Sequence, residues 1–171
     1  MNENEPAPGC AWAAFFLEHH RALTAYALAL VGRMEDAEDL IQDVLLKMVR
    51  SRQPVKSARP FVMRCLRNLA VDRHRSATRR PPPGEWPDCG VAFLAPPARD
   101  AAERDRSARA RAALEQLPPP QLEVIVLKVY AGLTFLEIAE TVDKPIGTVT
   151  SHYRRGLEGL RERLCREVNH A

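Results

Sequence analysis

The stretch "DKPIGTVTSHYRR", residues 143–155, predicts a sharp helix start. Pro145 cannot extend a preceding helix but suits the first turn of a new one. Gly147 lacks a Cβ, so we expect it to let two helices approach closely. A buried stripe is predicted by apolar residues recurring at steps of three and four: Val149, Tyr153, Leu157, Leu160 and Leu164. The residues left outside are short and polar or cationic: Thr148, Thr150, Ser151, His152, Arg154 and Arg155.

The residues before this stretch predict a helix-turn-helix. "QLEVIVLKVYA", residues 121–131, is a helical segment that ends at Gly132, which suits a left-handed cap. Thr134 and Glu137 have the spacing of a capping box and open a short helix whose inward residues are Ile138, Ala139 and Val142. A recognition helix needs hydrogen-bonding side chains at its start and cations for phosphates. The alternative from spacing alone is an amphipathic core helix with a solvated face.

The rest of the chain is also predicted to be helical. The pattern favours helices over residues 12–31, 37–49, from Pro60 onward, and 104–116. In the helix after Pro60 we expect an apolar stripe of Phe61, Cys65, Leu66, Leu69 and Ala70, with the arginines off it. No segment alternates with a period of two, so the predicted fold class is all-α.

A proline-rich segment divides the chain. Residues 81–102 contain six prolines and two glycines, and proline removes a backbone donor and clashes with the preceding turn. We therefore predict two small helical domains, over residues 10–80 and 103–168, joined by a flexible linker at 81–102.

Charge and composition limit the classes of function. The chain has 171 residues and a net charge of +3, but residues 35–43 hold five acids, whereas residues 59–80 hold seven arginines and one acid. These opposite runs suggest two different partners, one of them nucleic acid. No apolar run is long enough for a membrane helix, and residues 1–10 lack signal-peptide features, so we expect a cytoplasmic protein.

Neither a metal site nor catalysis is predicted. The four cysteines, Cys10, Cys65, Cys89 and Cys165, are far apart and form no CxxC pair, so we interpret them as free thiols. The cysteines and histidines have no metal-ligand spacing. No nucleophile–base motif or glycine-rich phosphate loop is present, so we expect no enzyme activity and no cofactor.

Two segments resemble a known family. "ALEQLPPPQLEVIVLKVYAGLTFLEIAETVDKPIGTVTSHYRRGLEGLRERL", residues 113–164, closely resembles region 4 of bacterial sigma factors. "DAEDLIQDVLLKMVR", residues 36–50, followed by "RPFVMRCLRNLAVDRHRSATRR", residues 59–80, resembles their region 2. Nothing between them resembles region 3. This layout is similar to that of the extracytoplasmic-function (ECF) group, which implies recruitment of core RNA polymerase to promoters under control of an anti-sigma protein.

The resemblance also implies site residues. In such factors the "DLIQD" helix docks on polymerase, which implies Asp39, Gln42 and Asp43 as contacts. The arginine-rich helix captures the melted −10 strand, which implies Arg67, Asn68, Arg73 and Arg75, with loop 51–59 as the pocket for a flipped base. For the −35 duplex, the resemblance implies contacts from the helix-turn-helix residues Thr148, Thr150, Ser151, His152, Arg154 and Arg155.

The sequence departs from the family at four positions. Phe61 stands where relatives usually have Trp, and Asp143 stands where they have Gly. Thr150 and His152 stand where Lys or Arg is common. Two alternatives stay open: a sigma-like decoy that binds an anti-sigma protein without reading DNA, and a stand-alone helix-turn-helix regulator. The regulator would dimerise on a palindrome, whereas a sigma factor is expected to be monomeric when free.

Overall fold

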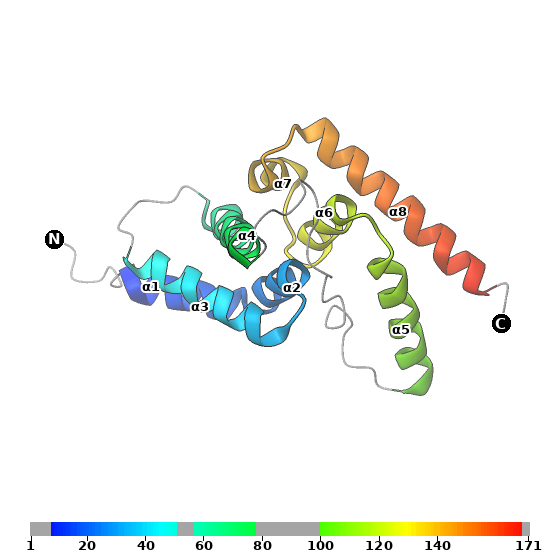
Figure 1. The fold of residues 1–171 in the computed structure, drawn as a ribbon, viewed down its shortest axis with the longest axis horizontal. Helices are drawn as coiled ribbons and strands as arrows, with labels where there is room; N and C mark the ends of the chain where they lie inside the picture. The colour runs from blue at the N-terminus through cyan, green and yellow to red at the C-terminus, as the bar shows by residue number, and fades with distance from the viewer. Residues whose placement is uncertain (1–7, 51–56, 78–99, 169–171) are drawn as a thin grey trace.

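The computed structural model describes residues 8–50, 57–77 and 100–168, and this part of the chain is helical without a strand. The first half contains α1 (Pro8–Glu18), α2 (His20–Val31), α3 (Met34–Arg50) and α4 (Ala58–Ala77). The second half contains α5 (Ala101–Glu115), α6 (Pro119–Val129), α7 (Phe135–Val142) and α8 (Ile146–Val168). Figure 1 shows α8 as the longest helix, with α5 beside its C-terminal part. The predicted all-α fold is confirmed.

Local rules set most helix ends. α2 ends at Gly32, whose φ of 83° is left-handed and whose N–H donates to the Leu28 carbonyl at 2.8 Å. The predicted single helix over residues 12–31 is instead two helices that meet at His19, where φ is −101° and ψ is 11°. α5 begins at Ala101 because the Asp100 carboxylate accepts from the Glu103 N–H at 2.7 Å. The helix therefore starts two residues inside the segment predicted as linker.

The prolines between α5 and α6 also start a helix. Pro118 is the N-cap of α6, and Pro119 and Pro120 fill its first turn, where the missing N–H groups cost nothing. Gly132 has a φ of 64°, as the sequence predicted, although α6 itself ends at Val129. None of the described helices is both long and apolar enough to span a bilayer.

The predicted inner stripe of α8 is only partly correct. Val149 is fully buried, and Tyr153 and Leu160 pack on the core, but Leu157 is 42% exposed and Leu164 is 36% exposed. Gly156 is buried instead, where a Cβ would lie 2.7 Å from Ile125 Cδ1. The close helix contact therefore depends on Gly156 against α6. The role predicted for Gly147 is wrong, because no atom of a neighbouring helix lies within 4 Å of where its Cβ would be.

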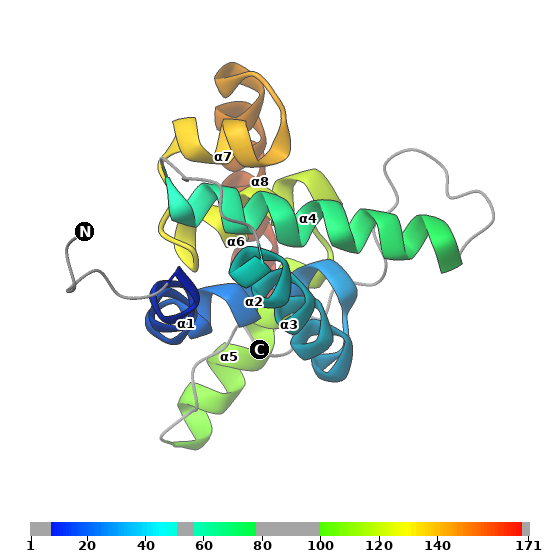
Figure 2. The ribbon, with the colours of Figure 1, turned by 90° about the vertical axis from the view of Figure 1, so that its left-hand side faces the viewer.

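The two halves pack against each other. Each half has its own contacts, such as α2 on α3 and α6 on α8, but α4 also packs on α7 and α2 on α6. Figure 2 shows α4 running between α7 on one side and α2 and α3 on the other. The buried apolar side chains of both halves form one continuous cluster, from Phe16 to Val149. We call this packing of α4 on α7 and α2 on α6 the closed arrangement.

Contact on two sides explains the burial of α4. Its most deeply buried side chains are Val62, Met63, Leu66 and Ala70. The predicted stripe residues Phe61, Cys65 and Leu69 are only partly buried. The sequence indicated one apolar face, whereas the helix has two covered faces because a distant segment packs on the second.

Candidate nucleic-acid and polymerase interfaces

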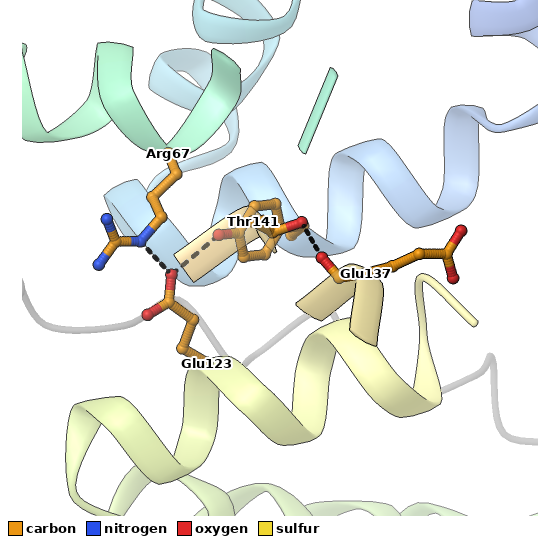
Figure 3. Close-up of polar contacts among 5 residues, drawn as sticks. Arg67, Glu123, Glu137 and Thr141 are labelled. Carbon is orange, nitrogen blue, oxygen red and sulfur yellow. Dashed lines mark hydrogen bonds and ion pairs between the residues drawn. The ribbon is translucent and has the colours of Figure 1, made fainter. Parts of the chain in front are cut away.

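The first helix of the helix-turn-helix, α7, is started by a capping box. The Thr134 Oγ1 accepts from the Glu137 N–H at 3.2 Å, and the Glu137 carboxylate accepts from the Thr134 N–H at 2.8 Å. The backbone N–H of Thr134 lowers the pKa of Glu137 below its usual range. One turn later the Thr141 hydroxyl donates to the Glu137 carbonyl at 2.8 Å (Figure 3). The predicted capping box is confirmed.

Asp143 ends α7 in a left-handed conformation. Its φ of 55° and ψ of 53° are those of a C-cap that glycine fills without strain. Asp tolerates this region better than most residues but still carries a steric cost. Two residues on, the Pro145 carbonyl accepts from the Thr148 and Val149 N–H groups at 2.9 and 3.1 Å, which starts α8. The sequence departure at Asp143 thus falls on the one described non-glycine residue with positive φ.

The start of α8 is open to a partner. Thr150, Arg154 and Arg155 are exposed, and Thr148 and Ser151 are half-buried. The Thr150 hydroxyl donates to the Ile146 carbonyl at 3.1 Å. Because its proton is used within the helix, the Thr150 oxygen can only accept a hydrogen bond from a partner outside the chain. Arg154 Nε lies 3.8 Å from Glu158 Oε1 in a weak exposed pair. Arg155 makes no ion pair with the described residues, so its guanidinium is available to a phosphate or a base edge.

His152 differs from its neighbours. The sequence predicted it on the reading surface, but its side chain is half-buried, and the buried Nδ1 makes no hydrogen bond. It lies close enough to Glu123 on α6 for a charged imidazole to lower the pKa of that carboxyl. His152 is therefore turned partly toward α6 in the closed arrangement, unlike the exposed Arg154 and Arg155.

The acidic side of α3 is exposed as predicted. Ala37, Leu40, Val44 and Met48 point into the core, which leaves Asp39, Gln42 and Asp43 outside. Asp43 already has a partner within the chain, because its Oδ2 accepts from Arg73 Nη2 of α4 at 2.5 Å. The structure thus joins a predicted polymerase contact to a predicted −10 contact through an exposed ion pair.

The four predicted −10 residues of α4 fall into two groups. Asn68 and Arg75 are exposed, whereas Arg73 is paired with Asp43. Arg67 is only 22% exposed at its side chain, and its Nε donates to Glu123 Oε1 of α6 at 2.9 Å. Figure 3 shows Arg67 and Glu123 pointing toward each other from α4 and α6. Of loop 51–59, residues 51–56 lie outside the described part of the chain.

Sequence reasoning missed two residues of this contact. The Tyr26 hydroxyl of α2 donates to the same Glu123 oxygen at 2.9 Å, so three helices meet at one carboxylate. Tyr26 is fully buried and Glu123 is 8% exposed. The available signal was a single acid inside the apolar run "LEVIVL", because a carboxylate there needs a partner when it is buried. Its partners, 56 and 97 residues away, had no such signal.

Burial dominates the electrostatics of this cluster. Desolvation raises the pKa of Glu123 above its usual range, although Arg67 and the Tyr26 hydrogen bond oppose it. Desolvation and the Glu123 carboxylate raise the pKa of Tyr26 well above that of an ordinary phenol, so Tyr26 stays a hydrogen-bond donor. Among the described residues no group of acids, histidines and cysteines has the arrangement of a metal site, and Cys65 and Cys165 are free thiols.

Comparisons with known proteins match both halves. The family model described as "Sigma-70 region 2" matches residues 15–80, and that described as "Sigma-70, region 4" matches residues 107–160. The chain is 31% identical over 152 residues to the ECF RNA polymerase sigma factor SigL of Mycobacterium tuberculosis, covering 86% of this chain and 85% of that protein. It is 30% identical to SigD of the same species, covering 85% of this chain and 73% of SigD.

Solved structures agree in fold. The sigma factor RpoE of Bartonella quintana, solved with the anti-sigma factor NepR, aligns with a TM-score of 0.65 at 23% identity over 90% of this chain and 96% of that one. CnrH, solved with the cytosolic domain of CnrY, aligns with a TM-score of 0.64 at 21% identity over 92% and 89%. Both family models match in the order that the helices take here, and the identity to curated relatives extends across both halves. The chain therefore belongs to the sigma-70 family of RNA polymerase sigma factors, in its extracytoplasmic-function group.

Proposed function

We propose that this factor divides promoter recognition among three helices. The α3 residues Asp39, Gln42 and Asp43 dock on core RNA polymerase. The start of α8 contacts the −35 duplex through Thr148, Thr150, Ser151, His152, Arg154 and Arg155. The helix α4 holds the melted −10 strand through Arg67, Asn68, Arg73 and Arg75.

The observation that carries this proposal is the exposed polar and cationic start of α8. The left-handed Asp143 and the Pro145 carbonyl, which accepts from the Thr148 and Val149 N–H groups, set where α8 begins. Arg154 and Arg155 are exposed in its third turn. Exposed cations and hydroxyls at a helix start match the needs of groove recognition. The exposed α3 acids support a second, separate contact, because carboxylates suit cationic residues of a protein partner.

Reconstituted transcription tests the proposal. Core polymerase is mixed with the full chain and a library of promoter fragments, and the starts of the transcripts are mapped. We expect starts that depend on the chain and share sequence near −35 and −10, and none with core polymerase alone. Transcripts without a shared sequence would overturn the assignment of α8 and α4, and no chain-dependent transcript would favour the decoy.

The decoy has one observation in its favour. Thr150 and His152 supply no fixed positive charge at the reading surface, and His152 is half-buried. Arg154 and Arg155 stand against the decoy, because it has no need of exposed cations on that helix. A decoy would bind its anti-sigma protein and leave transcription unchanged.

We further propose that an anti-sigma protein controls this factor. Both similar solved structures are sigma factors in complex with an anti-sigma factor. The full chain, tagged and recovered from its own cells before and after stress, should co-purify with such a protein in one condition and with polymerase in the other.

A further inference from the structure

The contact between the halves covers part of the proposed −10 surface. α4 carries the proposed −10 residues and packs directly on α7, the first helix of the helix-turn-helix. Near the start of α4, Arg59 lies against the second half, where its Nη1 would be 3.8 Å from a Cβ placed on Gly132. Farther along α4, Arg67 reaches Glu123. The same helix, α4, therefore carries both the proposed DNA contacts and contacts that join the two halves.

The chemistry of the Arg67 contact resembles a DNA contact. A guanidinium binds a carboxylate and a phosphate with the same donors, and both bonds are charge-assisted. The Glu123 oxygen is buried and also accepts from Tyr26, so it forms a built site rather than a chance surface pair. While Glu123 holds Arg67, that Nε donor is not available to a phosphate.

The closed arrangement also keeps the two proposed DNA surfaces close together. Elements at −35 and −10 are separated by 25 base pairs, or about 85 Å of duplex. α8 has 23 residues, so the longest helix of the second half measures about 35 Å. Because α7 contacts both α4 and α8, the two proposed DNA surfaces lie side by side in the closed arrangement, so we infer that the halves separate on the promoter.

We propose that Glu123 is an internal ligand of the −10 surface: it occupies Arg67 while the halves are closed, and the promoter strand competes with Glu123 for this guanidinium. This inference rests on the proposed −10 role of Arg67. It adds that the free factor is restrained by its own α6 and that separation of the halves precedes or accompanies strand capture. The apparent affinity of the free chain for the strand is lowered by the fraction of chains that are closed.

Charge reversal at position 123 tests the inference in the full chain. Glu123→Lys places a cation against Arg67 and should open the halves, seen as a larger radius of gyration by small-angle X-ray scattering. Glu115→Lys is the matched control, because it makes the same charge change at an exposed residue of α5. If about a tenth of wild-type chains are open, Glu123→Lys should bind a single-stranded −10 oligonucleotide about tenfold more tightly than Glu115→Lys does.

A charge swap tests the pair itself. Arg67→Glu with Glu123→Lys restores opposite charges and should return the compact radius that Glu123→Lys loses. Tyr26→Phe removes one hydrogen bond without changing charge and should shift both measurements in the same direction by less. Circular dichroism of each variant checks that its helices are intact.

The outcomes are separable from those of the proposed function. A compact Glu123→Lys chain, or an open one with no gain in strand affinity over Glu115→Lys, overturns the inference. If opening and the affinity gain occur but wild-type chain starts no transcripts with core polymerase, the proposed function fails while the internal contact stands.

Discussion

The start of α8 and the middle of α4 both carry arginine side chains, but these side chains differ in how far they are exposed to solvent. The start of α8 was predicted as a nucleic-acid surface from its residue pattern, and the −10 role of α4 was implied by the family resemblance. In the structure Arg154 and Arg155 are exposed, whereas Arg67 is mostly buried against Glu123. A cationic face in a sequence is therefore a set of donors that either a ligand or another part of the chain binds.

The difference also separates two kinds of ion pair. The Arg73–Asp43 pair is exposed on one half and contributes little to stability. The Arg67–Glu123 pair joins the halves out of water, where loss of one partner leaves a buried charge. We expect the first pair to exchange readily with polymerase and DNA and the second to require separation of the halves.

The largest expected effect is at α3. Asp39→Lys with Asp43→Lys should weaken binding to core polymerase about 100-fold, or ~2.7 kcal/mol, because two accepting carboxylates become cations. The measurement is a binding titration with labelled polymerase, with helicity checked by circular dichroism. Glu115→Lys with Glu140→Lys makes the same charge change at exposed residues of α5 and α7 and is the charge control. Unchanged affinity in the double variant would contradict docking of polymerase on these two acids.

The second largest effect is expected at the exposed start of α8. Arg155→Ala should cost about 1–3 kcal/mol of holoenzyme binding to a promoter if it reads a base pair, with relaxed preference there. If it contacts only phosphate, all sequences should weaken alike and the salt slope should fall by about one. Single-base variants of the −35 element at two salt concentrations distinguish these outcomes. Arg161→Ala, at an exposed arginine farther along α8, is the control.

A smaller effect concerns the turn that sets α8. Asp143→Gly should raise the free energy of unfolding by roughly 0.5–1 kcal/mol, because glycine adopts positive φ without a Cβ clash. Asp143→Ala keeps a Cβ and should give no gain. Thermal unfolding of the three chains measures this. A gain in both variants would mean that the aspartate charge, and not its backbone, is unfavourable.

The smallest effect is a pH dependence of closure. Burial raises the pKa of Glu123 in the closed arrangement, so the closed chain binds this proton more tightly than the open one. Closure should therefore strengthen as pH falls through the raised pKa, weaken as pH rises through it, and level off below the ordinary carboxyl pKa. The groups facing Glu123 are Tyr26 on α2, Arg67 on α4 and His152 on α8.

Scattering across mildly acidic to neutral pH measures this dependence. Glu123→Gln keeps an oxygen acceptor for Arg67 and Tyr26 but does not titrate, so its radius should vary less with pH than that of the wild type. An equal dependence in both chains would assign the titration to other groups.

The sequence by itself determined the features that follow from local rules. The helical class, the Thr134–Glu137 box and the left-handed Gly132 depend on residues a few positions apart, and all three are present. The exposed acids of α3 follow from helical periodicity. The family resemblance also depended on contiguous motifs.

Only the tertiary structure decided which surfaces are covered. Periodicity shows one apolar face per helix, but it does not show that α7 covers a second side of α4 or that Gly156, rather than Gly147, approaches a neighbour. The Arg67–Glu123 and Tyr26–Glu123 contacts join residues 56 and 97 positions apart. These contacts form only because the two halves of the chain pack together, which the helical periodicity of each half does not show. A lone acid in an apolar run indicates that the acid needs a partner when it is buried, but not which residue the partner is.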